Sequence, residues 1–344
     1  MFHELTADQA RVFIDSEQTY QAYCHARNLA SSYRGSMHWK TVGDRKYLYK
    51  VRNSRSPAKS LGPESIETRQ IYQEFSSGKL KASERLALIT QKLKNQARLC
   101  KAVRINRAPS IVTSILRQMD LAGILGKNLI VIGTNALFAY EAAASGQFSS
   151  DIMITTDVDF MWDSRTKLIL TGDVDDLKKD GFIGLLKKVD SSFDPVYKRG
   201  FRAVNKSGFF VDLVKPVPPI DENESDQIGS EDKIWASEIP SLKWLASCQK
   251  FSQIVIGNDG FPAPLIAPDP RAFALYKLWL SRQPDREPIK KERDRLQAIA
   301  VAKLIIQRLS HLQFLENELR AFPDEIIQLA SKSIDDLPGG FFVP

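Results

Sequence analysis

Hydrophobic and polar positions follow two different periods along the chain. Before about residue 122, apolar residues recur at helical spacing, except in two short runs, Met37–Thr41 and Lys46–Val51. These runs flank the turn sequence Val42-Gly-Asp, which predicts a β-hairpin. From residue 128 onward, short apolar runs alternate with helical segments. That alternation is typical of an α/β fold with a mixed sheet.

The first third of the chain is predicted to be mostly helical. A helix begins after the capping sequence Thr6-Ala-Asp-Gln and ends at Gly35. After the hairpin, the polar and basic segment Asn53–Gly62 predicts a loop. Three more helices follow: one from Pro63-Glu64 to about Gly78, one over Ala82–Arg104, and one from Ala108-Pro-Ser to about Ala122.

The middle of the chain predicts a sheet with helices packed on it. Asn128–Ile132 reads as a buried strand that ends at Gly133, and the small apolar residues of Ala136–Ala144 predict a helix lying against it. The remaining elements are the strand Thr155–Trp162, the helix Asp173–Lys188, and a hairpin made by Phe201–Asn205 and Phe209–Val214.

A change of composition separates this middle part from the C-terminal part. Lys215–Asp232 contains PVPP and six acidic residues, which predicts a linker. A hairpin, Ser252–Ile256 with Pro262–Ile266, and the helices Pro270–Leu280 and Pro288–Leu309 come after it. We therefore predict three parts: an N-terminal helical region with a β-hairpin (1–115), a mixed-sheet core (116–222) and a mostly helical C-terminal domain (223–344).

Composition places the chain among globular proteins. Of its 344 residues, 43% are hydrophobic and 26% are charged. The three cysteines are far apart and form no CxxC motif, which argues against a disulfide scaffold or a cysteine-rich zinc site and predicts a cytoplasmic protein. No apolar run reaches the roughly 18 residues of a membrane span, so we expect no membrane partner.

Three aspartates are the candidate catalytic residues. Asp157 and Asp159 are two positions apart on a predicted strand, so both carboxylates lie on one face, while Val158 and Phe160 face the core. Two adjacent carboxylates repel each other unless a cation such as Mg²⁺ lies between them. Asp212 stands inside an apolar strand, where an acid is costly unless it is paired or binds metal. If the two strands are neighbours, the three carboxylates converge.

A glycine turn precedes these acids and is a candidate phosphate site. Gly133-Thr134 lies where a strand meets a helix, and a helix N-terminus offers free N–H groups to phosphate oxygens. A phosphate site beside an acid cluster suits two-metal phosphoryl or nucleotidyl transfer. Each feature alone has a simpler interpretation: a surface acid pair, a strand-to-helix turn capped by threonine, and an edge-strand acid facing water.

Taken together, these motifs resemble the nucleotidyltransferase superfamily with the polymerase-beta-like fold. The shared pattern is Ile132-Gly133-Thr134, then Asp157-Val158-Asp159, then Val211-Asp212-Leu213. Threonine replaces the usual glycine or serine, and the long gap between the first two motifs suits toxin-like bacterial branches. An uncharacterised bacterial nucleotidyltransferase-fold group is more similar, over most of residues 37–310. It shares Ser60-Leu-Gly-Pro, Gly133-Thr-Asn-Ala-Leu-Phe-Ala-Tyr-Glu and Thr156-Asp-Val-Asp.

A more distant similarity concerns the abortive-infection-type toxin nucleotidyltransferases. Their C-terminal motif is similar to Lys277, Arg282 and Arg293-Asp294 of this chain. In that family the lysine helps to hold the nucleotide and the later aspartate supports the site. The resemblance therefore implies roles for Lys277, Arg282 and Asp294 in nucleotide binding, although a solvent-exposed helix face is an equally simple interpretation of Lys277.

The resemblance implies a Mg²⁺-dependent enzyme that transfers an NMP from an NTP. Asp157, Asp159 and Asp212 would hold two Mg²⁺ ions, and Gly133, Thr134 and Asn135 would hold the phosphates. We expect the acceptor to be a nucleic acid, such as tRNA, or a protein, as in toxins that are paired with an antitoxin. The alternatives are a small-molecule adenylyltransferase and a nucleic-acid-binding protein that has lost catalysis.

Charge gives a second indication of a nucleic-acid partner. The net charge is +7 and the isoelectric point is about 9.1. No acidic residue occurs between Glu84 and Asp120, and the tyrosines Tyr47 and Tyr49 lie among basic residues of the hairpin. Such a pattern suits phosphate contacts and base stacking. The basic residues are Arg85, Lys92, Lys94, Arg98, Lys101, Arg104, Arg107 and Arg117, with Arg45, Lys46, Lys50, Arg52, Arg55 and Lys59 in the hairpin and loop.

Overall fold

The computed structural model describes residues 2–52, 57–163, 175–218, 227–228 and 232–334. Its contacts divide the chain into two compact units. We call Met1–Ala10 with Asn106–Pro344 the sheet unit, and Arg11–Ile105 the helical-hairpin unit. The predicted three-part division at residues 115 and 222 stays a prediction. None of the described helices has the length and apolar character that a membrane span requires.

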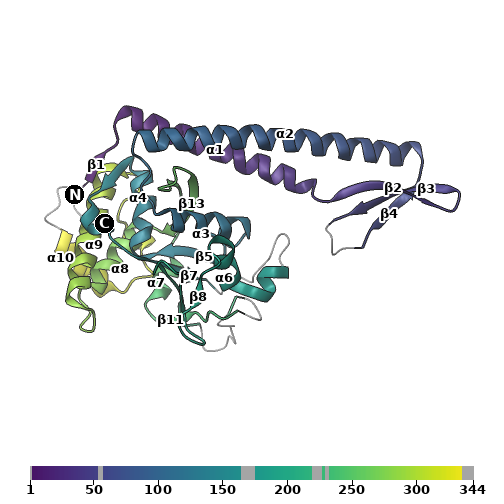
Figure 1. Ribbon diagram of the computed structural model, residues 1–344. Helices are drawn as coiled ribbons and strands as arrows, with labels where there is room; N and C mark the ends of the chain where they lie inside the picture. Colours follow the sequence, from purple (N-terminus) through teal and green to yellow (C-terminus); the bar gives the residue numbers. More distant parts are fainter. Residues whose placement is uncertain (1, 53–56, 164–174, 219–226, 229–231, 335–344) are drawn as a thin grey trace. The chain divides into compact units, whose positions relative to one another are not determined.

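A mixed six-stranded sheet forms the centre of the sheet unit (Figure 1). The strand order is β5-β7-β10-β9-β8, and β11 also pairs with β10. Strand β7 is antiparallel to β5 and parallel to β10, whereas β9 is antiparallel to β10. This confirms the predicted α/β class with a mixed sheet. The strands are β5 (Leu129–Ile132), β7 (Asp157–Trp162), β8 (Asp194–Pro195), β9 (Arg202–Val204), β10 (Phe210–Lys215) and β11 (Ser237–Glu238).

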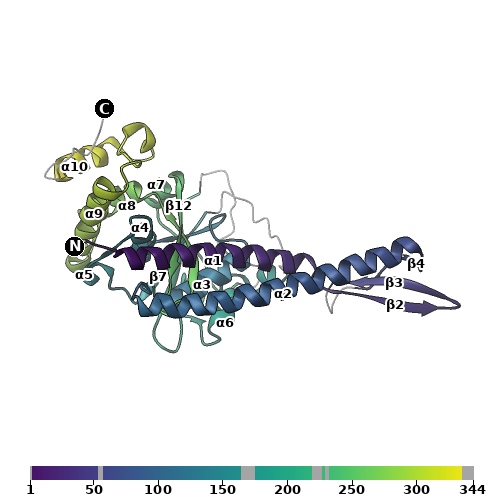
Figure 2. The same cartoon turned by 90° about the horizontal axis from the view of Figure 1, so that it is seen from above.

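Helices and two small strand pairs surround this sheet. Helices α8, α9 and α10 lie together (Figure 2). The strand pairs are β1 (Phe2–Glu4) with β6 (Gly146–Phe148), and β12 (Lys250–Ile256) with β13 (Pro262–Pro268). The helices are α3 (Ser110–Leu121), η1 (Gly133–Ala136), α4 (Leu137–Ala143), α5 (Ser150–Met153), α6 (Asp175–Val189), α7 (Leu242–Ser247), α8 (Pro270–Leu280), α9 (Pro288–Arg308), η2 (Glu316–Glu318) and α10 (Asp324–Ile334).

One hydrophobic core joins the sheet to the C-terminal helices. The core runs from Ala108 to Ala330 and includes Phe160 of β7 and Leu213 of β10. Phe273 of α8 and Leu304 of α9 belong to the same cluster. The elements on either side of the predicted linker are thus packed together through a shared apolar interior.

Part of the predicted linker has a structural role. The helix predicted over Asp173–Lys188 is α6, but its backbone is non-helical at Gly181, where φ is +59°. Asp232 accepts hydrogen bonds from the backbone N–H groups of Phe182 (2.5 Å) and Ile183 (3.4 Å), directly after this break. The acid at the end of the linker segment therefore caps a helix. Residues 219–226 and 229–231 of that segment lie outside the described residues.

The helical-hairpin unit consists of two long helices and a three-stranded sheet. Gln96 donates to the carbonyl of Val12 (2.9 Å), and the thiol of Cys100 lies 3.5 Å from the hydroxyl of Ser16, so the two helices pack side by side. The sheet joins the end of the first helix to the start of the second (Figure 1). The elements are α1 (Ala7–Ser32), β2 (Ser36–Val42), β3 (Arg45–Val51), β4 (Lys59–Pro63) and α2 (Ile66–Ala102).

The prediction that a helix ends at Gly78 was wrong. Helix α2 continues from Ile66 to Ala102 without interruption. A Cβ atom at Gly78 would collide with the ring of Tyr33, so the missing side chain allows α1 and α2 to approach closely. The loop prediction for Asn53–Gly62 was wrong at its end, since Lys59–Gly62 belongs to β4; residues 57–58 are irregular, and residues 53–56 lie outside the described residues.

Helix α3 offers a direct test of the shared core. Leu116 is fully buried, whereas Leu121 on the same helix is 55% exposed. We expect Leu116→Ala to lower the free energy of unfolding by about 2–5 kcal/mol, because it leaves a cavity. Leu121→Ala should change it by less than about 0.5 kcal/mol. Urea unfolding measures both values, and equal losses would contradict this core.

Candidate active site

Three aspartates lie side by side on two neighbouring strands. On β7, Asp157 and Asp159 alternate with Val158 and Phe160, and both of these apolar residues are fully buried. Strand β10 is parallel to β7 with Asp212 directly opposite Asp159. Neighbouring strands are about 4.8 Å apart, so the register alone brings the carboxylates of Asp159 and Asp212 close together.

The pKa of Asp159 reflects the closeness of these acids. Burial, together with the negative charges of Asp157 and Asp212, raises the pKa of its carboxyl group from 3.8 to about 7. Lys277 and Arg202 act in the opposite direction on the same group. The pKa of Asp159 thus reflects mainly its burial and, after that, the two neighbouring carboxylates.

Arg202 binds Asp212 with both arms of its guanidinium group. Its Nε donates to Oδ1 of Asp212 (2.7 Å), and its Nη2 donates to Oδ2 (2.6 Å). This hydrogen bond with Asp212 also raises the pKa of Arg202. Arg202 lies opposite Asp212 in the register of β9 and β10. The sequence analysis missed this arginine, although counting back from the Ser207-Gly208 turn would have found it.

The carboxylates have protein donors in this arrangement. Besides the Arg202 contact, the hydroxyl of Thr155 donates to Oδ1 of Asp157. Within the residues that the structure describes, no three acidic, histidine or cysteine residues form a group arranged to hold a metal ion. Arg202 therefore competes with any cation for the two oxygens of Asp212.

Gly133 lies against the acid cluster because of its backbone conformation. Strand β5 ends at Ile132, opposite Asp159, and Gly133 follows with φ of +66°. A Cβ atom at Gly133 would collide with Oδ2 of Asp159. Both the positive φ and the close approach to Asp159 require glycine at this position. The strand-to-helix turn predicted from the sequence requires glycine for the same reason.

Two polar residues after this glycine hold neighbouring elements in place. Asn135 donates through Nδ2 to the backbone carbonyl of Asp157 (2.7 Å), while its own Oδ1 is buried with no hydrogen-bond partner among the described residues. Gln297 of α9 donates to the hydroxyl of Thr134 (3.2 Å) and to the carbonyl of Ile152 (2.7 Å). Because the Thr134 hydroxyl is engaged by Gln297, its contact with phosphate stays a prediction.

A buried ion-pair network connects helices α8 and α9. Lys277 donates to Oδ1 of Asp294 (2.6 Å), and Arg286 donates to Oδ2 of the same carboxylate (2.8 Å). Burial lowers the pKa of Lys277, and the adjacent Asp294 charge opposes that shift. The positive charge of Lys277 also lowers the pKa of Asp159, so this network adjoins the acid cluster.

The other two basic residues that the resemblance pointed to, Arg282 and Arg293, lie outside this ion-pair network. Arg282 is exposed and donates to the hydroxyl of Ser333 on α10 (3.2 Å). Arg293 donates to the carbonyl of Ile154, three residues before β7 (3.3 Å). Sequence reasoning missed Arg286 and Gln297, since nothing in their spacing distinguishes them from other residues around α9.

Comparison with protein-family models now adds to this geometry. Residues 110–322 match the model of a family described as Nucleotidyltransferase. The chain belongs to this nucleotidyltransferase family. No curated protein and no solved structure gave a significant match.

Family membership confirms the predicted resemblance to nucleotidyltransferases and makes the protein a transferase with an NTP substrate. The matched residues of this nucleotidyltransferase include Gly133, the three aspartates and the Lys277–Asp294 pair. The helical-hairpin unit, Arg11–Ile105, lies outside the match.

The ion-pair network of the nucleotidyltransferase can be tested by its stability. Asp294 is fully buried, so Asp294→Asn leaves the buried Lys277 without its counter-charge and should lower the free energy of unfolding by about 3–5 kcal/mol. Lys277→Met in the same background should recover part of the loss. The control is Glu292→Gln on α9, which removes an exposed pair with Arg295 and should cost less than about 1 kcal/mol. Equal costs in urea unfolding would contradict the network.

Proposed function

We propose that this nucleotidyltransferase transfers an NMP from an NTP in a Mg²⁺-dependent reaction that uses Asp157, Asp159 and Asp212. The observation that carries the proposal is the parallel register of β7 and β10, which places Asp212 opposite Asp159. Three acids lie on two adjacent strands beside a glycine turn, and Arg202 pairs with one of them, Asp212. These carboxylates form the oxygen-rich environment that a hard divalent cation prefers.

The residues present fit Mg²⁺ by their chemistry. All the candidate ligands are carboxylate oxygens, and a bound cation would favour the ionised form of Asp159, whose pKa burial raises. Asp157 and Asp159 would hold two ions, and Asp212 would hold the one nearer the nucleophile. When bound, the metal neutralises phosphate charge and makes the attacking hydroxyl more acidic.

The chain's own groups would bind and orient the nucleotide. The backbone at Gly133 can approach the phosphates closely because there is no side chain in the way. The buried Oδ1 of Asn135, which has no hydrogen-bond partner among the described residues, is an acceptor within η1, and its Nδ2 fixes the start of β7. Lys277 would contribute positive charge towards the leaving pyrophosphate, with Asp294 holding its ammonium group.

Asp212 would also accept the proton of the attacking hydroxyl, directly or through water. Arg202 has to share or release this carboxylate, since it takes both oxygens in the present arrangement. We infer that the acceptor is a nucleic acid such as tRNA, or a protein, as in toxin-like transferases that have an antitoxin. A small-molecule acceptor and a binding protein without catalysis are the two alternatives.

Loss of single carboxylates tests the catalytic assignment. We expect Asp157→Asn, Asp159→Asn and Asp212→Asn each to lower transfer at least about 100-fold, since each removes a charged ligand. The assay follows label from each NTP, with Mg²⁺, into total RNA or lysate protein. Asp151→Asn, which changes an exposed acid six residues before Asp157, is the matched control and should retain activity. Wild-type activity in any of the three variants would refute the assignment.

Thermal melting tests the cation separately from turnover. The folded-state pKa of Asp159 is above its ordinary value, so ionising this group costs stability as the pH rises towards 8. Asp159→Asn should therefore raise the Tm of the metal-free protein at pH 8 by about 3 °C or more. Mg²⁺ should raise the Tm of the wild type but not that of the variant. A wild-type Tm that ignores Mg²⁺ at pH 8 would contradict metal binding here.

A further inference from the structure

The positive charge of the chain is concentrated in the helical-hairpin unit. Arg11–Ile105 contains 19 of the 48 Lys and Arg residues but only 7 of the 41 acidic ones, a formal charge of +12. The rest of the chain carries −5, although the net charge of the whole is +7. A unit with this imbalance attracts a polyanion strongly.

Two members of the predicted basic stripe have structural roles in the sheet unit instead. Arg107 forms an ion pair with Glu141 (2.7 Å), and Arg117 forms one with Asp259 (2.8 Å). Residues of the helical-hairpin unit are different, because many of its lysines and arginines are exposed on α2 and on the three-stranded sheet. Exposed examples are Lys40, Arg45, Lys46, Lys59, Lys81, Arg85, Lys92, Lys94 and Lys101.

One face of the three-stranded sheet is covered by α2, and the other carries aromatic and basic side chains. Trp39 contacts Tyr72 of α2, and the Lys50 ammonium lies over the ring of Phe75. The opposite face pairs His38 with Tyr49, and Lys40 with Tyr47. The rings of His38 and Tyr49 are stacked, with centroids 6.2 Å apart and planes at 19°. Both faces thus place aromatic rings beside lysines.

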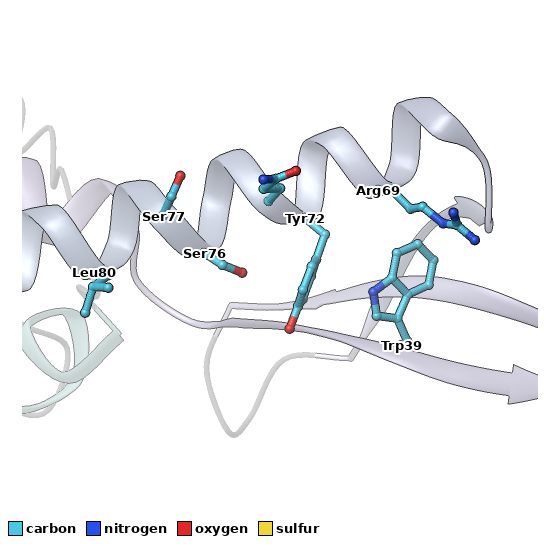
Figure 3. Close-up of a pocket in the computed structure, with 7 residues that line it drawn as sticks. Trp39, Arg69, Tyr72, Ser76, Ser77 and Leu80 are labelled. Atoms are coloured by element: carbon cyan, nitrogen blue, oxygen red, sulfur yellow. The ribbon is translucent and has the colours of Figure 1, made fainter.

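A hollow lies between α2 and the covered face of this sheet (Figure 3). Its volume is about 490 Å³, and its lining is mainly apolar. Trp39 and Tyr72 form one side, with ring centroids 5.9 Å apart, and Arg69 lies beside the indole. The remaining lining residues share one face of α2 and are Gln73, Ser76, Ser77 and Leu80.

We propose that the helical-hairpin unit binds a single-stranded nucleic acid. Its exposed lysines and arginines hold the phosphates, and an unpaired base enters the hollow and stacks on Trp39. Bases stack on any aromatic face, and a flat ring matches a mainly apolar hollow whose lining includes Arg69. An acidic peptide would use the same charges but would have no ring to place there. Binding does not depend on the transfer chemistry, whereas use of the bound strand as the acceptor rests on the proposed function.

The test measures binding alone, with the full-length Asp212→Asn protein in EDTA and without NTP. Fluorescence anisotropy follows fluorescein-labelled single strands of RNA and of DNA, about 20 nucleotides long, over a range of salt concentrations. The double variant Lys40→Glu/Arg45→Glu should weaken binding of the preferred strand at least about tenfold. The matched control, Lys243→Glu/Arg320→Glu, makes the same charge change at exposed positions of the sheet unit and should weaken it less than about twofold.

Stacking is tested with Trp39→Leu, which keeps an apolar side chain against Tyr72. We expect affinity for the single strand to fall about fivefold or more, while affinity for heparin, a polyanion without bases, stays the same. Trp39→Phe keeps a ring and should retain most of the binding, provided that the melting curves of all variants match. If Trp39→Leu does not fold, the Trp39→Phe and charge variants decide the outcome.

Several results would overturn the proposal. These are undetectable binding, binding that salt does not affect, equal losses in the two double variants, or competition by polyglutamate as strong as that by unlabelled RNA or DNA. Preference for RNA or for DNA identifies which nucleic acid is bound, and either supports the proposal. Strand binding without any nucleotidyl transfer would refute the proposed function and leave this inference standing. Nucleotidyl transfer without strand binding would refute this inference and leave the proposed function standing.

Discussion

The organisation of the site depends on mutual repulsion between buried carboxylates. The register of β7 and β10 places Asp159 and Asp212 opposite each other, and burial makes the charge of Asp159 more costly than it would be in water. Arg202 and Lys277 offset part of this cost, yet the pKa of Asp159 is still raised to about 7. A fold selected for stability alone would not retain such an arrangement. Its cost is explained if the site exists to bind positive charge.

The C-terminal helices complete this site and are more than a scaffold around it. Gln297 of α9 contacts Thr134 directly after the glycine turn, and Asp294 positions Lys277 near the acids. Both interactions are buried, where a hydrogen bond or ion pair that loses its partner is expensive. Displacement of α8 or α9 would therefore disturb the glycine turn and the acid cluster together.

Opposite charges are separated between the two units of this nucleotidyltransferase. The sheet unit is acidic overall and contains the residues matched by the family, whereas the helical-hairpin unit is strongly basic and lies outside that match. Chemistry that uses an NTP needs cations at the acid cluster, and binding of a polyanion needs free basic side chains. The two proposed surfaces thus fall on different units of one chain.

The local sequence pattern alone determined the strand that carries Asp157 and Asp159, the glycine turn, the hairpin of β9 and β10, and the α/β class. Hydrophobic periodicity and turn-forming residues are sufficient for these features, because both depend on near neighbours in the chain. It misplaced the end of a helix at Gly78, since close packing with Tyr33 is a long-range contact. The pairing of Arg202 with Asp212 follows from the same hairpin, but which strand lies beside β7, and that Gln297 reaches this site, was decided only by the tertiary structure. Strand order and buried partners depend on contacts between residues that are distant in the sequence.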